Sequence, residues 1–384
     1  MVASPDALST LVDTRRVLVT VGAGGVGKTT TAAALSVAAA RRGRRVLCLT
    51  IDPAKRLAES LGIGAMSTDA ATVDPARFEA IGVPIKGSLT AAMLDTKRTF
   101  DELVLKYSSS REKAERLLSN RLYQYVSTSL AGTQEYMAME KLVAVKDDPR
   151  YDFIVLDTPP TANALDFLDA PERLTEALDS ATMRWFVEAF QSSGKFSLNL
   201  VAKSAAAVLR GIGKITGGGF LEAMAEFISE LNELFGGFKE RAARVQQTLR
   251  SPDVAFVLVT SPSPPAIKEV LYFAERLEEA NMPRGALVVN RFHLPPPFAK
   301  EGVSEEHAAK GIERYGLTLE EDAPYRLVKA HADALKLALH DEANVRTLQN
   351  VAALPLVRVA ELDTDVYDLA LLTQLSDVLM AGGV

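Results

Sequence analysis

The stretch that decides the fold is VLVTVGAGGVGKTTTAAAL, residues 17–35. An apolar, β-branched run ends at a glycine-rich turn, and an alanine-rich run follows directly. Residues 22–29, GAGGVGKT, match the phosphate-binding pattern G-x-x-x-x-G-K-[ST] at each defined position. Glycines let backbone N–H groups surround phosphate oxygens, and a helix that begins there adds its positive end. The segment predicts a nucleoside triphosphate site between a strand and a helix. A plain glycine turn is the alternative, which the flanking elements disfavour.

The side chains of this loop have separate expected roles. Lys28 is predicted to bridge the β- and γ-phosphates, and the Thr29 hydroxyl to bind Mg²⁺. The positions expected to contact the nucleotide are Gly24, Gly25, Val26, Gly27, Lys28, Thr29 and Thr30.

Two aspartates end predicted strands and are candidates for the catalytic carboxylates. Asp157 ends the run FIVLD, where an acid can hold the Mg²⁺ indirectly, through a group that binds the ion. Asp52 ends RVLCLTID and precedes a proline. Because the carboxyl ends of parallel strands face one crevice, Lys28, Asp52 and Asp157 are expected to converge on the γ-phosphate. Asp52 is the candidate for activating the attacking water, with a helix cap or turn residue as the alternative.

Short apolar runs alternate with helical patterns along the chain. Their continuous apolar character, without polar alternation, is typical of parallel strands covered on both faces, and predicts a doubly wound, mostly parallel α/β sheet. The predicted strands are residues 16–22, 45–52, 78–83, 152–158, 254–261, 285–291 and 354–360.

Two long intervals, 87–150 and 171–250, contain no predicted strand and are expected to be helical. The expected organisation is one P-loop domain over 16–384, with segments 88–150 and 171–250 forming an inserted helical subdomain. The second segment carries an apolar stripe at helical spacing. Its candidate client-binding residues are Met224, Phe227, Ile228, Leu231 and Phe235. Such a stripe either packs between helices or lines a groove for an apolar helix, and packing is the better single interpretation.

Composition restricts the classes of binding partner and the cellular location that we expect. The 384 residues carry a net charge of −6 with both signs spread along the chain, which argues against nucleic acid as the main partner. The single cysteine, Cys48, excludes a disulfide within the chain and a cysteine-pair metal site. We find no signal peptide and no uninterrupted apolar stretch of about 18–20 residues, so we expect a cytoplasmic protein without a membrane span.

Several segments resemble one known family. The glycine-rich loop, DPAKRL (52–57), DTPPTANALDFLDAP (157–171) and VVNRF (288–292) are similar to the arsenical-pump ATPases, ArsA, and to their eukaryotic branch, the ATPase of the guided entry of tail-anchored proteins, GET. The resemblance runs from about Arg16 to the C-terminus. It implies ATP and Mg²⁺ as cofactors, a homodimer, Asp52 and Asp157 as switch residues, and Asn290, next to Arg291, at the adenine. Residues 360–362 would pack by the base.

The sequence departs from the family at three places. The family's first loop lysine, which reaches the partner subunit's phosphates, is replaced by Ala23. The cysteines that bind metalloid are absent, and so is the zinc-binding cysteine pair of the GET dimer interface. Metalloid activation and a zinc-held dimer are therefore not expected.

The resemblance implies that ATP binding and hydrolysis switch an apolar client surface, as in a targeting factor or chaperone for membrane-protein segments. Two alternatives are a MinD/ParA-like switch acting through a protein partner, and the ATPase subunit of an anion or arsenite exporter. The long insert and the acidic C-terminal segment disfavour the first alternative, and the cysteine count disfavours the second.

Overall fold

The computed structural model describes residues 7–51, 56–61, 63, 70–120, 123–124, 127, 133–158, 227 and 238–383. Its centre is an eight-stranded sheet of order β3-β4-β2-β5-β1-β6-β7-β8. All neighbouring strands pair in parallel except β3, which is antiparallel to β4. The predicted doubly wound α/β sheet is therefore confirmed. The strands are β1 (Val17–Val21), β2 (Arg45–Thr50), β3 (Ala71–Thr72), β4 (Ser88–Met93), β5 (Phe153–Asp157), β6 (Val254–Thr260), β7 (Arg284–Phe292) and β8 (Leu356–Ala360).

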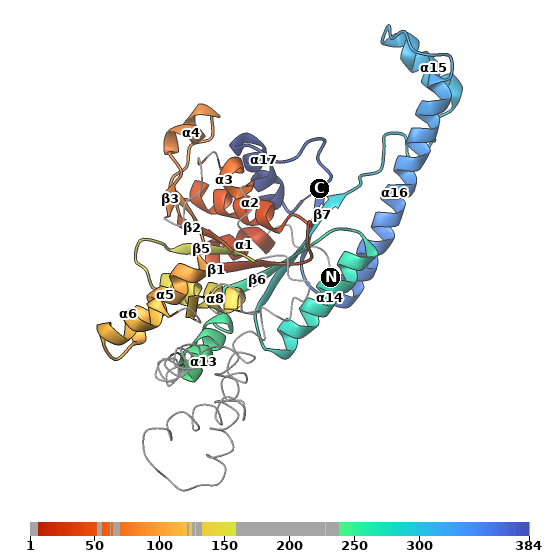
Figure 1. Cartoon of the computed structure of the whole chain (residues 1–384). Helices are drawn as coiled ribbons and strands as arrows, with labels where there is room; N and C mark the ends of the chain where they lie inside the picture. The colour runs from red at the N-terminus through yellow and green to blue at the C-terminus, as the bar shows by residue number, and fades with distance from the viewer. Residues whose placement is uncertain are drawn as a thin grey trace, which may run out of the picture.

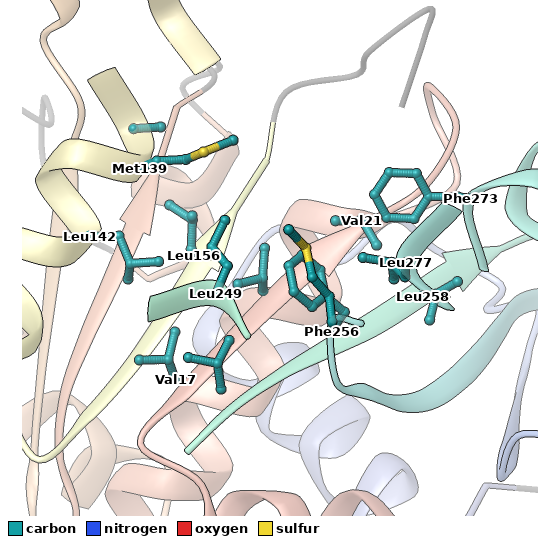
Figure 2. Close-up of a cluster of buried hydrophobic side chains, with 14 of the residues drawn as sticks. Val17, Val21, Met139, Leu142, Leu156, Leu249, Phe256, Leu258, Phe273 and Leu277 are labelled. Carbon is teal, nitrogen blue, oxygen red and sulfur yellow. The ribbon is translucent and has the colours of Figure 1, made fainter. Parts of the chain in front are cut away.

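Helices cover the sheet on both faces (Figure 1). Two apolar clusters lie on opposite faces of the sheet. Because side chains alternate along a strand, Val17, Val19 and Val21 of β1 belong to the first cluster and Leu18 belongs to the second. The first cluster, part of which is drawn in Figure 2, includes α8 (Thr133–Lys146), α13 (Phe238–Leu249), α14 (Pro264–Glu279) and α16 (Ala323–Ala352). The second includes α1 (Ala7–Thr14), α2 (Lys28–Arg41), α3 (Arg56–Ser60) and α17 (Leu369–Met380).

Three sequence-based assignments need correction. Residues 78–83 are not a strand, because α4 (Pro75–Ala80) occupies most of them. Asp74 caps this helix, its side chain accepting a hydrogen bond from the backbone N–H of Ala76, and the fully buried Phe78 anchors it. The interval 87–150 is not strand-free, because β4 pairs with β2 inside the sheet. The domain start at Arg16 leaves out α1, whose Leu8, Leu11 and Val12 are core residues.

Between β4 and β5, the described residues form α5 (Thr96–Tyr107), α6 (Arg111–Ser119) and α8. The end of the second predicted insert segment is α13. Phe227 is 8% exposed and packs in a small apolar cluster with Val104, Ala114, Leu117 and Tyr123. This contact joins residue 227 to the helices of the first insert segment.

One part of the structure projects from the body. We call residues 305–337, which comprise α15 (Glu305–Arg314), the loop after it and the first half of α16, the arm (Figure 1). No residue of α15 is buried. The large apolar side chains exposed on the arm are Tyr315, Leu317, Leu319, Tyr325, Leu327 and Leu337. None of the helices in the described part of the chain is both long enough and apolar enough to cross a membrane.

Candidate functional site

The glycine-rich loop connects β1, at the centre of the sheet, to α2. Gly27 caps the N-terminus of α2 with φ +96°, a backbone conformation that residues with a Cβ rarely adopt. A Cβ at this position would also lie 2.3 Å from Asn290 Nδ2. A Cβ on Gly22 would lie 1.9 Å from the carbonyl oxygen of Val259. The two glycines are therefore required both by the turn and by the close approach of β6 and β7.

Lys28 is the first residue of α2, and only 5% of it is exposed. Its Nζ donates a hydrogen bond of 2.8 Å to the carbonyl oxygen of Ala23, so the ammonium lies folded back over the loop. Ala23 itself is 8% exposed and packs in the apolar cluster on the α2 face of the sheet. The position that departs from the family pattern therefore lies in the apolar core, and its backbone carbonyl accepts the hydrogen bond of the loop lysine.

Asp157, at the end of β5, is fully buried, and hydroxyl groups surround it. Thr29 Oγ1 donates to Asp157 Oδ2 at 2.7 Å, and Thr50 Oγ1, from the end of β2, donates to the same oxygen at 2.9 Å. Thr20 Oγ1 lies 3.5 Å from Oδ1. A buried carboxylate is tolerated only when polar partners compensate it. The ends of two strands, β1 and β2, and the first turn of α2 supply them here. The structure thus joins Thr29, which follows Lys28 in the loop, to Asp157.

Asn290 ties the loop to the end of β7. Its Nδ2 donates a 3.0 Å hydrogen bond to the carbonyl oxygen of Val26, which leaves the amide oxygen as the acceptor of that side chain. Arg291 follows with φ +58°, the left-handed conformation that is uncommon for a residue with a side chain. Strained backbone of this kind concentrates at functional sites.

A cavity of about 470 Å³ opens between the loop and the segment after β8. Of the predicted contact residues, Gly25, Gly27, Lys28, Thr29, Thr30, Asn290 and Arg291 line it. Gly24 and Val26 do not line it, and Val26 contributes through its carbonyl oxygen to Asn290. Further lining residues are Ala33, Leu57, Ser60, Thr158, Glu361, Leu362, Thr364, Asp365, Val366, Tyr367 and Leu375.

Some predicted site residues lie outside the described residues. They are Asp52 and four of the stripe positions, Met224, Ile228, Leu231 and Phe235. The fifth stripe position, Phe227, is buried against α5 and α6, the arrangement that packing between helices predicts.

Sequence reasoning missed the residues that support Asp157. Thr20 and Thr50 are polar residues near the ends of otherwise apolar strands. A polar residue within such an apolar run was the sequence feature that could have predicted partners for Asp157. It also missed Tyr367, which comes to the cavity from the segment after β8. No local pattern marks that residue, because only the order of the strands brings it near the loop. Glu361, one of the residues 360–362 that the resemblance places by the base, lines the same cavity.

Comparison with known proteins agrees with this geometry. The family model described as anion-transporting ATPase, ArsA ATPase, matches residues 15–314. The ATPase GET3 of Malassezia globosa is 25% identical over 301 residues, which are 77% of this chain and 78% of that protein. The ATPase GET3 of Podospora anserina is 28% identical over 277 residues, 72% of this chain and 73% of that protein. The ATPase ASNA1 homolog 1 of Paramecium tetraurelia is 28% identical over 160 residues, only 44% of its own length.

Proposed function

The chain belongs to the ArsA family of anion-transporting ATPases and is an ATP-hydrolysing P-loop enzyme, and we propose that it uses Mg²⁺·ATP to switch a helical subdomain that binds apolar segments of membrane proteins. The observation that carries this proposal is that Thr29, which lines the cavity beside Lys28, hydrogen-bonds to the buried Asp157 carboxylate. In this proposal Lys28 leaves the Ala23 carbonyl to contact the β- and γ-phosphates, and the amide N–H groups at the start of α2 hold phosphate oxygens.

The donor set at this end of the cavity fits Mg²⁺. The ion prefers hard oxygen ligands and keeps several of its waters. The Thr29 hydroxyl supplies one such oxygen, and the buried Asp157 carboxylate lies 2.7 Å from it, where it can hold a water of the ion. When bound, Mg²⁺ would neutralise charge on the phosphates during transfer to water. Asp52, two positions along the chain from the end of β2, is our candidate for orienting that water.

Contacts between α8 and α13 support a link between the nucleotide site and the insert. α8 precedes β5, the strand that ends in Asp157. On α8 the Tyr136 hydroxyl donates to Glu140, and Arg241 of α13 lies 3.6 Å from the same carboxylate, with both charged side chains 9% exposed. Breaking such a buried ion pair is costly, so the two helices are expected to move together. A shift of Asp157 on hydrolysis would then reach the insert through α8.

The proposed client is an apolar helix, such as the membrane segment of a tail-anchored protein. Two features support this client: the resemblance to the GET branch and the apolar stripe. The stripe comprises Met224, Phe227, Ile228, Leu231 and Phe235. Since Phe227 packs on α5 and α6, we propose that it supports the client surface from below, and that Leu231 and Phe235 contact the client more directly. We also propose that the working unit is a homodimer in the cytoplasm.

The test combines trapping and capture. We expect Asp52→Asn protein to keep bound ATP and to retain its client, which mass spectrometry of the co-purified material would identify. Lys28→Ala should lose nucleotide binding and hydrolysis, and unchanged turnover in that variant would refute the assignment of the loop.

Capture of a purified tail-anchored protein is then compared between Leu231→Asp and a control, Leu105→Asp. Leu105 lies on α5 and is 56% exposed, so its substitution adds a charge to the surface of α5 outside the apolar cluster that holds Phe227. We expect capture to fail only in Leu231→Asp. Equal capture by both variants, or none by the wild type, would contradict the client proposal.

A further inference from the structure

A row of three polar side chains crosses the sheet beneath the first turn of α2. In the parallel register, Asp157 of β5 lies beside Thr20 of β1 on one side and beside Thr50 of β2 on the other. At most 1% of each of these residues is exposed. Because side chains alternate along a strand, all three point to the face of the sheet that α2 covers. The row therefore places two hydroxyl groups beside the carboxylate that Thr29 contacts from the loop.

The two hydroxyl groups of the strands are not equivalent partners of the carboxylate. Thr50 Oγ1 donates to Asp157 Oδ2 at 2.9 Å, within the range of a normal hydrogen bond. Thr20 Oγ1 lies 3.5 Å from Oδ1 and 3.3 Å from the carbonyl oxygen of Leu156, so its one proton is divided between two distant acceptors. Thr50 is therefore the stronger of the two donors that β1 and β2 give to Asp157.

Thr50 and Thr29 donate to the same carboxylate oxygen, one from the sheet and one from the loop. The torsion that turns a carboxylate has broad wells, so fixed partners are needed to hold the group in one orientation. When Thr50 holds Oδ2, the proton of the Thr29 hydroxyl is directed to Asp157. The oxygen of that hydroxyl then keeps its lone pairs for a metal ion.

We propose that Thr50 is a positioning residue of the metal site, whose hydroxyl holds Asp157 Oδ2 toward Thr29 and so strengthens the binding of Mg²⁺ with the nucleotide. This inference rests on the nucleotide site proposed above. Thr50 is 1% exposed and does not line the cavity, so it acts through Asp157 and not on the nucleotide directly. Residues that orient the groups around a metal ion typically change its affinity by about 10- to 100-fold.

The experiment measures how much Mg²⁺ improves the binding of AMPPNP, an ATP analogue that is not hydrolysed. Titration calorimetry gives its dissociation constant with Mg²⁺ and with EDTA, and the ratio of these constants is the metal-dependent gain. We expect the wild type to gain at least about tenfold. Thr50→Val, which keeps the shape of the side chain but removes the donor, should bring the gain close to one. Thr50→Ser keeps the hydroxyl and should keep the wild-type gain.

Thr90→Val is the matched control for loss of a buried hydroxyl from the sheet. Thr90 lies on β4 and is 6% exposed, and its hydroxyl pairs with Thr72 Oγ1 at 3.1 Å. This variant should keep the wild-type gain. If Thr50→Val weakens AMPPNP equally with Mg²⁺ and with EDTA, the proposal is overturned, because a purely structural role changes both constants alike.

A second variant covers the case in which Thr50→Val does not fold. Thr50→Cys replaces the hydroxyl with a thiol, which is a weak donor, and should also lower the gain. An unchanged gain in this variant would count against Thr50 as the positioning residue. If the wild type itself does not bind AMPPNP, or binds it equally with and without Mg²⁺, the proposed function is refuted and this inference with it.

Discussion

The Thr29 hydroxyl donates a 2.7 Å hydrogen bond to Asp157 Oδ2, joining the first turn of α2 to the end of β5. The two residues are 128 positions apart in the chain, and the carboxylate is fully buried. The Thr29 hydroxyl, which we propose binds the metal ion, and the Asp157 carboxylate, which we propose holds a water of that ion, therefore already point toward each other. Thr50 donates to the same oxygen and keeps the carboxylate from turning away.

Asp157→Asn should keep nucleotide binding and reduce hydrolysis by about 10- to 100-fold, the usual cost of removing a carboxylate that supports a metal site. Steady-state phosphate release at several Mg²⁺ concentrations measures this effect. Asp152→Asn is the matched control, because Asp152 directly precedes the same strand and lies at its opposite end. Equal turnover in both variants would remove Asp157 from the metal site.

Ala23→Lys restores the lysine that the family carries at this loop position. Ala23 is 8% exposed and its carbonyl accepts from Lys28, so the new side chain must extend out of the core, and we expect some loss of thermal stability. If the proposed dimer lacks the contact between this lysine and the partner subunit's phosphates, the substitution should raise turnover per subunit. The increase should depend on protein concentration, because it requires two subunits to associate. A turnover that stays flat over a wide dilution range would show that no such contact is missing.

Cys48 is expected to be unreactive in the folded protein. Its side chain is fully buried in β2, and burial raises the pKa of the thiol to about 12. Since the thiolate is the reactive form, the thiol stays protonated at all pH values below that range. Ellman's reagent at pH 8 should therefore label Cys48 only after denaturant is added, and labelling at the rate of a free thiol in native buffer would contradict the burial of β2.

Asp152 gives a prediction for stability against pH. Burial raises the pKa of its carboxyl, but hydrogen bonds from Arg44 and Arg45 outweigh burial and hold that pKa below its usual value. A lowered folded-state pKa stabilises the fold above the unfolded value near 4, and this contribution is lost as pH falls through the folded-state pKa.

The side chain of Asp152 is 35% exposed, so solvent screening limits its contribution to about 1 kcal/mol. Urea unfolding should therefore find Asp152→Asn less stable than the wild type by up to that amount at pH 7. The difference should shrink when both are measured near pH 3. A difference that is the same at both pH values would argue against the ion pairs with Arg44 and Arg45.

The phosphate loop was the part of the site most accessible to sequence reasoning. Its glycines, Lys28 and Thr29 are contiguous, and each has a local physical requirement that a pattern can state. The rule that the carboxyl ends of parallel strands meet predicted that Asp157 lies near this loop, and its hydrogen bond with Thr29 is the contact by which it does so. Asp341 of α16 and His293, which follows β7, are hydrogen-bonded although they are 48 residues apart, and no rule of that kind joins a helix face to a strand end.

The errors in the fold came from short segments where tertiary contacts decide. FEAIGV has the apolar content of a strand, yet Asp74 and Pro75 just before it begin a helix, and Phe78 is buried from that helix. SLTAAM, which forms β4, has few β-branched residues and resembles a helix in isolation. It is a strand because β2 presents an edge to which it can add.

The length of the arm determines how far a small tilt of α16 moves its outer end. α16 is a single helix of 30 residues, and Asp341, fixed to His293, lies within the part that packs on the body. Ala323, at its far end, is about 27 Å from Asp341 at the rise of an α-helix. A tilt of about 10° at that anchor would carry the far end about 5 Å, with α15 attached to it. The short end of the helix contacts His293, which lies 3.7 Å from Glu361 of the cavity lining. A spectroscopic label near Tyr315 would therefore report a tilt of α16 at that contact in magnified form.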